Sequence, residues 1–198
     1  MLRTILFTLI AAGVIVGLDH PAFAWDGTRK GFILGAGVGG GLISYTQEIS
    51  GSNISVKSDR ENTLAFMYDV RIGYAPSNLW QIYYLSEASW FGLDNIVGDR
   101  VTIASGLSGV GVTKYVRAQA PSPFFLGSIG LTTWSTPFEE RSGTWVGAGL
   151  MLGGGFEFSR HWSVEGNLVW GKPKDEDSGV EVSSNTFSIR VTVNVLGY

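Results

Sequence analysis

The sequence predicts an all-β fold, an eight-stranded antiparallel up-and-down transmembrane β-barrel. Three observations support this prediction. Apolar residues alternate with small or polar ones along much of the chain. The connections between the alternating segments are short and long in alternation, and aromatic residues gather near the segment ends. A barrel that crosses a bilayer is apolar outside and can be polar inside, so the alternation fits such a fold.

The clearest alternation lies in residues 145–170. Leu150, Leu152 and Phe156 share one parity, whereas Glu157 and several glycines take the other. After the polar break at residues 159–161 the alternation resumes as far as residue 170. Period-two patterning on both sides of a three-residue turn indicates a β-hairpin. Because glycine and glutamate cannot fill an apolar core, we expect the apolar face to meet lipid and the other face to line the lumen.

The other six strands are expected at residues 30–46, 63–74, 79–91, 101–116, 124–134 and 185–198. Segment 63–74 alternates most cleanly, and the turn at 75–78 makes it a hairpin with the next strand. A register centred on Ser77 would place Arg71 opposite Tyr83. In segment 101–116 apolar residues fall on both parities, which leaves a β-bulge or a shifted register open.

The connections between these segments alternate in length. Short ones are expected at residues 75–78, 117–123 and 159–161, and longer polar ones at 47–62, 92–100, 135–144 and 171–184. An up-and-down barrel with both termini on the short-turn side must show this alternation. In outer-membrane barrels the short turns face the periplasm and the long loops face outward.

The start of the chain predicts export. A basic residue at Arg3 precedes an apolar run over residues 4–18, and Ala22-Phe23-Ala24 supplies a small-x-small cleavage site. We therefore expect a signal peptide over residues 1–24 and a single barrel domain over residues 25–198. A membrane anchor is the alternative, although the apolar run is short for a helix that spans a bilayer.

Composition narrows the classes of function. The chain has no cysteine, which excludes disulfides, thiolate metal sites and cysteine nucleophiles. Its formal net charge of −3 provides no basic footprint for nucleic acid. Residues 175–177 are acidic but lack the ligand spacing of a defined calcium site, so no metal and no cofactor is expected.

Aromatic residues predict two belts at the membrane interfaces. Rings near strand ends match the amphipathic girdles that flank the lipid band of transmembrane barrels. The residues expected to form this girdle are Tyr74, Trp80, Trp90, Trp134, Trp145, Phe158, Trp162 and Trp170.

In this pattern the chain resembles the small eight-stranded outer-membrane barrels of the OmpA/OmpX type, the family of outer-membrane β-barrel domains. The resemblance covers the whole mature chain and is most specific at residues 154–163 and in the last strand, which ends on the aromatic residue Tyr198. It implies the outer membrane of a Gram-negative bacterium, contact with its lipid and lipopolysaccharide, and insertion by the barrel-assembly machinery. Leu196 and Tyr198 have the opposite parity to Val195, so the terminal pattern requires a slip near Gly197.

One motif raises the possibility of catalysis. His161-Trp162-Ser163 has the His-x-Ser spacing that outer-membrane lipid A deacylases use, in which a carboxylate would complete a triad. Val164 stands where that family commonly has Asn, and His161 is expected in a periplasmic turn, far from the outer leaflet. We therefore assign no catalytic residue, and a lipid A-modifying enzyme remains the alternative function.

Charged residues of inward parity are expected to meet in the lumen. They are Asp69, Arg71, Glu87, Glu157, Glu165 and Arg190, with Lys114 a further cation if Ile103 faces outward. Side chains nearly fill an eight-stranded barrel, so these charges should pair and plug it, with Arg71 as the hub. A porin-like ion path is the alternative.

The sequence therefore predicts a structural or surface-interaction protein of the outer membrane that acts through its extracellular loops. The loops have ordinary polar composition and do not identify an extracellular partner. A secreted lipocalin-like carrier with an apolar cavity is a third possibility, which the inward glutamates and arginines disfavour.

Overall fold

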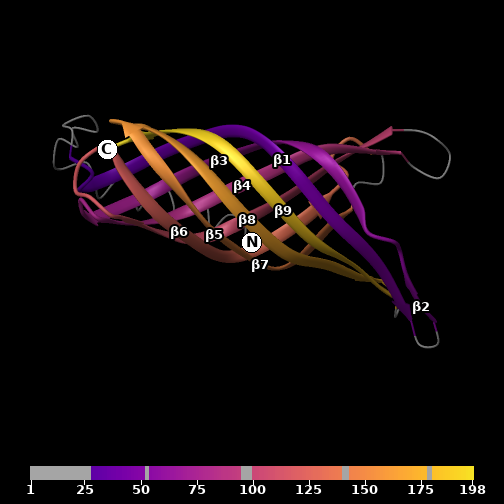
Figure 1. The fold of residues 1–198 in the computed structure, drawn as a ribbon. Coiled ribbons are helices and arrows are strands. Elements are labelled where there is room, and N and C mark those ends of the chain that lie inside the picture. Colours follow the sequence, from indigo (N-terminus) through magenta and orange to yellow (C-terminus); the bar gives the residue numbers. More distant parts are fainter. Residues whose placement is uncertain (1–27, 52–53, 95–99, 140–142, 178–179) are drawn as a thin grey trace.

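The computed structural model describes residues 28–51, 54–94, 100–139, 143–177 and 180–198, and these residues form one closed antiparallel barrel (Figure 1). The expected signal peptide lies outside them. The strands are β1 (Gly31–Gly51), β2 (Ile54–Lys57), β3 (Glu61–Ser77), β4 (Trp80–Asp94), β5 (Arg100–Tyr115), β6 (Ser122–Ser135), β7 (Thr144–Ser159), β8 (Trp162–Asp177) and β9 (Val180–Gly197). The described residues contain no helix long and apolar enough to cross a membrane.

The barrel closes through β1. Each long strand pairs with the next along the chain, and β1 pairs with both β3 and β9, which leaves eight strands in the closed barrel. The short strand β2 pairs with the far end of β1. Closure pairs the backbone of both terminal strands, which is what a bilayer requires of a spanning sheet. The eight-stranded up-and-down fold predicted from the sequence is therefore confirmed.

Two hairpins are longer than the sequence predicted. Residues 47–62 and 171–184 were expected as loops, yet most of them belong to β1, β2, β8 and β9. The strands continue because their ladders do: Ser50 pairs with Glu181, and Glu176 pairs with the same residue from the other side. These hairpins extend beyond the barrel at the end opposite the C-terminus (Figure 1).

The β3–β4 hairpin has a different register from the predicted one. Arg71 lies opposite Leu85 and not Tyr83, because the register shifts between Tyr74 and Ser77. Pro76 falls in this interval and has no N–H to donate to a ladder. The displacement is two residues, so every side chain keeps its predicted face.

Strand β5 pairs with β6 without a bulge from Ala104 to Tyr115. Its large inward residues Ile103 and Leu107 are buried, whereas Val110 is exposed. Lys114 was expected in the lumen only if Ile103 faced outward; Ile103 faces inward, and Lys114 lies on the outer wall and is exposed.

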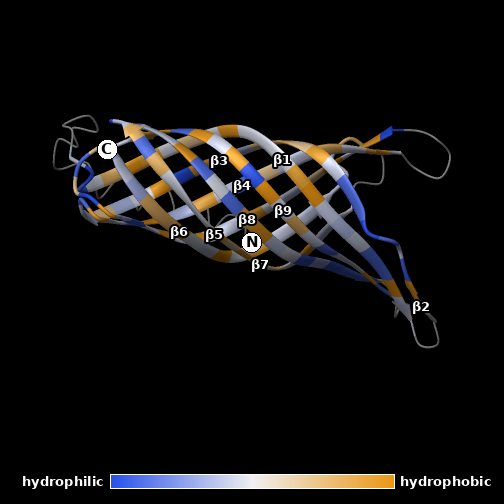
Figure 2. Cartoon of the chain, viewed as in Figure 1, coloured by the Kyte–Doolittle hydropathy of each residue, from blue (hydrophilic) through white to orange (hydrophobic). Residues whose placement is uncertain are grey.

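The outer wall is apolar between two aromatic levels. Hydrophobic and hydrophilic residues alternate along the strands, and hydrophilic ones gather at the two ends of the barrel (Figure 2). On β9, Val195 pairs with Trp162 and Phe187 pairs with Trp170, so two aromatic levels lie eight residues apart. At about 3.3 Å per residue and a tilt near 40°, that separation spans roughly 20 Å, close to the apolar band of transmembrane barrels.

Candidate functional site: the filled lumen

The interior of the barrel is divided into a polar and an apolar side. Strands β4 to β7 supply most of one large apolar cluster, whose buried members are Ile33, Ala75, Tyr83, Leu85, Leu107, Tyr115, Phe124, Leu126, Met151, Val169 and Tyr198. Strands β3, β8 and β9 supply most of the buried charges and amides. The sequence predicted the charges but not the apolar side. On β7 the inward positions carry mostly glycine and Glu157, whereas on β4 and β5 inward positions also carry leucine.

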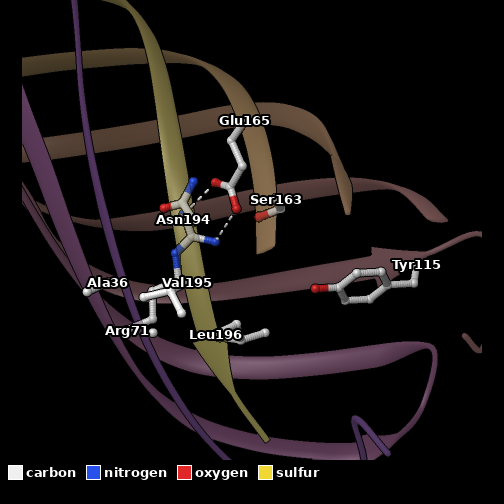
Figure 3. Close-up of a pocket in the computed structure, with 9 residues that line it drawn as sticks. Ala36, Arg71, Tyr115, Ser163, Glu165, Asn194, Val195 and Leu196 are labelled. Carbon is white, nitrogen blue, oxygen red and sulfur yellow. Dashed lines mark hydrogen bonds and ion pairs between the residues drawn. The ribbon is translucent and has the colours of Figure 1, made fainter. Parts of the chain in front are cut away.

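Arg71 joins two carboxylates on the polar side. Its Nε donates to Asp69 Oδ1 at 3.1 Å. Its two terminal nitrogens donate to the two carboxylate oxygens of Glu165 at 2.8 and 2.5 Å (Figure 3). Strand β1 makes room for this group with glycine. A Cβ on Gly37, which faces Asp69 across the ladder, would lie 2.7 Å from Asp69 Oδ2.

Arg190 forms a second centre beside the first. Its Nη1 lies 2.6 Å from Glu87 Oε2, and its Nη2 lies 3.9 Å from Asp69 Oδ2. The same Nη2 donates to the carbonyl oxygen of Tyr68 at 3.2 Å. Asp69 thus lies between the two guanidinium groups, and five of the six predicted lumen charges form one connected network.

Glu157, the sixth, belongs to a separate cluster at the short-turn end. Arg29, which precedes β1 and is 2% exposed, donates to its carboxylate through two nitrogens and stacks on Tyr115 with its Cζ 4.0 Å from the ring centroid. The hydroxyl of Tyr198 donates to the other oxygen of Glu157 at 2.7 Å. Arg29 also donates to the carbonyl oxygens of Asn78 and Arg117 in two turns.

This cluster closes the short-turn end of the lumen, and sequence reasoning missed its cation. Arg29 lies before the first alternating segment, so no periodicity marks it. The only signal was arithmetic: four inward carboxylates were assigned against two inward arginines, and a buried carboxylate requires a partner.

The other end of the lumen is closed by aromatic rings. Trp134 is 2% exposed, with its ring centroid 5.1 Å from that of Tyr45 and 5.5 Å from that of Phe91. Trp145 stacks on Trp134 at 6.3 Å. The placement of Trp134 and Trp145 in the lipid-facing girdle was therefore wrong. Both have inward parity and pack where the lumen ends, because an unfilled mouth would expose the apolar residues below it.

The other predicted girdle residues lie on the outer wall. Trp90 is half-buried there, and its ring lies 6.0 Å from that of Phe138. The exposed ones are Tyr74, Trp80, Phe158, Trp162 and Trp170.

The residues of the His-x-Ser motif have different surroundings. The Nδ1 of His161 lies 2.8 Å from the carbonyl oxygen of Leu196, and its ring packs 4.5 Å from that of Tyr198. Ser163 is 8% exposed and lines the lumen beside Glu165 (Figure 3). The histidine is thus held by the C-terminal strand, and the serine faces the interior.

The cavity beside Arg71 on the polar side of the lumen is small. A cavity of about 10 Å³ lies between Gly35, Arg71, Ser163, Glu165 and Asn194 (Figure 3). That volume holds about one water molecule. The site can therefore hold paired charges and a bound water, but a hydrated ion does not fit this cavity.

No protein-family model and no curated protein sequence matches this chain. Solved structures do match it. OprG from Pseudomonas aeruginosa has a TM-score of 0.53 at 11% identity, over 87% of this chain and 98% of that one. AlkL, solved by solid-state NMR in DMPC bilayers, has a TM-score of 0.50 at 12% identity, over 90% and 95%. Neisserial surface protein A gives 0.44 at 14% identity, over 82% and 97%. At these identities the likeness to OprG and AlkL shows the fold alone, that of small outer-membrane β-barrels.

Proposed function

We propose that this chain is an integral outer-membrane barrel without enzymatic activity, and that it acts as a structural or surface-interaction protein through its projecting hairpins. The paired charges and packed rings of the lumen would then form a rigid core. Two aromatic levels on either side of an exposed aliphatic wall support a position in the bilayer. Outer-membrane lipid, lipopolysaccharide and the barrel-assembly machinery would be its general partners.

The projecting sheet is the observation that carries this proposal. Beyond the barrel, β2 pairs with β1, β1 with β9 and β9 with β8, which makes a four-stranded antiparallel extension. One row across its four strands consists of Val56, Ile49, Val182 and Asp175, and the apolar Val56 and Ile49 are exposed. A sheet that continues out of a membrane barrel with exposed apolar residues provides an ordered surface for a partner.

Ion pairing also orders this extension. Lys174 donates to Glu181 Oε2 at 2.8 Å across the β8–β9 hairpin. This hydrogen bond raises the pKa of Lys174 and lowers that of Glu181. The contribution of the pair to the stability of the fold is therefore present when the pH is above the ordinary pKa of a glutamate. It is lost as the pH falls through the lowered pKa of Glu181. Both groups are exposed, so this contribution is small.

A lipid A-modifying enzyme is less well supported. Its motif would need His161 and Ser163 to meet a lipid substrate together, whereas the histidine contacts Leu196 and Tyr198 and the serine faces the lumen. A soluble carrier would bury its apolar residues, in contrast to the exposed aliphatic wall.

The projecting hairpins can be shortened without touching the barrel. Glu48 pairs with Lys57, and Asp175 pairs with Val182, so each pair can be joined by an Asn-Gly turn. We expect the doubly shortened variant to fold, as judged by its shift on unheated gels. Cells that carry it should adhere several-fold less than cells with the full chain to at least one of three probes: plain, amine-modified or carboxylate-modified polystyrene beads.

The matched control is a full-length chain with a peptide epitope inserted between residues 52 and 53. It should be detected by antibody on intact cells and should adhere like the parent. Equal adhesion of the shortened variant to all three beads would contradict the surface-interaction proposal. A change in lipid A mass upon expression of the parent would support the enzyme instead.

A further inference from the structure

Among the described residues, exposed acidic side chains are confined to one end of the barrel, whereas exposed basic side chains occur at both ends. The rim at the short-turn end, here called the basic rim, exposes Lys30, Lys114, Arg117 and Arg160. Among the described residues of this rim no carboxylate is exposed, because Glu157 is buried against Arg29. The exposed acidic residues of the described chain lie at the opposite end: Asp59, Glu61, Glu139, Asp175 and Glu176. The basic rim therefore has uncompensated positive charge.

The basic residues of the rim lie beside lipid-facing rings. Lys114 pairs with Trp80 on one side and with Phe125 on the other, and its Nζ lies 5.0 Å from the Trp80 ring centroid. Trp80 and Phe125 are both exposed on the outer wall. The ion pairs formed by described residues do not include Lys114.

Two other basic residues of the rim lie close in sequence to exposed rings. Lys30 lies two residues before the exposed Phe32, at the start of β1. Arg160 lies in the turn between the exposed Phe158 and Trp162. Three cations thus occupy the level at which aromatic side chains mark the boundary between hydrocarbon and headgroups.

We propose that the basic rim binds the phosphates of anionic phospholipids, and that Lys114, between Trp80 and Phe125, holds one of them. A lysine on a lipid-facing wall extends its ammonium toward the interface, where a headgroup phosphate supplies the partner that the protein does not. The two flanking rings fix the level of the ammonium and cover its aliphatic stem. This inference concerns the inner leaflet and goes beyond the proposed role of the hairpins, on which it does not depend.

A soluble polyanion is a weaker fit to the same charges. Arg117 and Arg160 lie in turns that water-soluble molecules could reach. Lys114, however, lies on the lipid-facing wall at the level of Trp80 and Phe125, where the phosphate of a phospholipid is the nearest anion. The rim also has mixed lysine and arginine separated by rings, an arrangement that favours several headgroups over one extended chain.

The test compares two triple variants with the same change in charge. The first is Lys30→Gln, Lys114→Gln and Arg160→Gln, and the control at the opposite end is Lys57→Gln, Arg60→Gln and Lys172→Gln. Folded protein in detergent is given equimolar phosphatidylglycerol and phosphatidylcholine, and bound lipids are counted by native mass spectrometry. A basic residue near an anionic surface contributes roughly fivefold to lipid partitioning, so the rim variant should lose its phosphatidylglycerol preference by at least about tenfold.

The parent and the control variant should keep that preference, and Lys114→Arg should keep it because the charge remains. Lys114→Gln alone should show a larger loss than Lys30→Gln or Arg160→Gln alone. Equal preference in the rim variant and the control would overturn the proposal, as would a parent that binds both lipids equally. Displacement of the lipid by millimolar inorganic phosphate would also overturn it, since the site would then be one for free phosphate.

Discussion

Replacing Arg71 by alanine is expected to lower the free energy of unfolding by about 3–5 kcal/mol, the usual cost of breaking a buried ion pair from one side. The substitution removes both hydrogen bonds to Glu165 and the bond to Asp69. Asp69 keeps Arg190 nearby, but Glu165 is left with a 3.5 Å contact from the Asn167 amide. Urea unfolding in lipid vesicles, followed by tryptophan fluorescence, measures the effect.

A second substitution tests whether the stranded carboxylate is the cause. Adding Glu165→Gln to Arg71→Ala should recover part of the lost stability, because the charge without a partner is then gone. Arg100→Ala is the matched control, since Arg100 is exposed and its removal should change stability by no more than about 0.5 kcal/mol. An Arg71→Ala variant as stable as the parent would mean that these carboxylates are hydrated and not paired.

Replacing Val191 by arginine is expected to cost roughly 2–4 kcal/mol, the penalty measured for a lipid-facing arginine at the bilayer midplane. Val191 is 57% exposed on the outer wall of β9, midway between the levels marked by Trp162 and Trp170. The same vesicle unfolding experiment applies, with assembly in cells as a second measure.

Phe158→Arg tests whether the cost of a lipid-facing arginine depends on its depth in the membrane. Phe158 is exposed at the end of β7, at the interface level, where an arginine should cost about 0–1 kcal/mol. If the two arginine variants were equally stable, the midplane would not lie at Val191, and the membrane position derived from the aromatic levels would be wrong.

The faces of the strands could be predicted from the sequence because side chains alternate with period two, and a register error of two residues leaves the faces unchanged. The β3–β4 hairpin illustrates this: its register was wrong, yet Arg71 and Asp69 were correctly placed inside. Position near a strand end, in contrast, does not fix a face. Trp134 and Trp145 were placed by that criterion alone, although their parity matches that of the lumen residues Thr132 and Gly149.

Two other features had no signal in the alternation. The outer parts of β8 and β9 are rich in charged and polar residues, so the sequence there is that of a loop although the ladder continues. Arg29 enters the lumen from outside any strand. Its position depends on Glu157, Tyr115 and the turn carbonyl of Asn78, which come together only when the barrel closes.

Single-channel recording in planar bilayers tests the central claim, a membrane barrel whose lumen is closed by paired charges and packed rings. The aromatic cluster around Trp134 at one end, the Arg29–Glu157 pair at the other and a cavity of about 10 Å³ between Arg71 and Glu165 predict small and erratic currents at most. Steady, large single-channel currents from the purified full-length protein would contradict it, because they would require an open path along the polar side of the lumen.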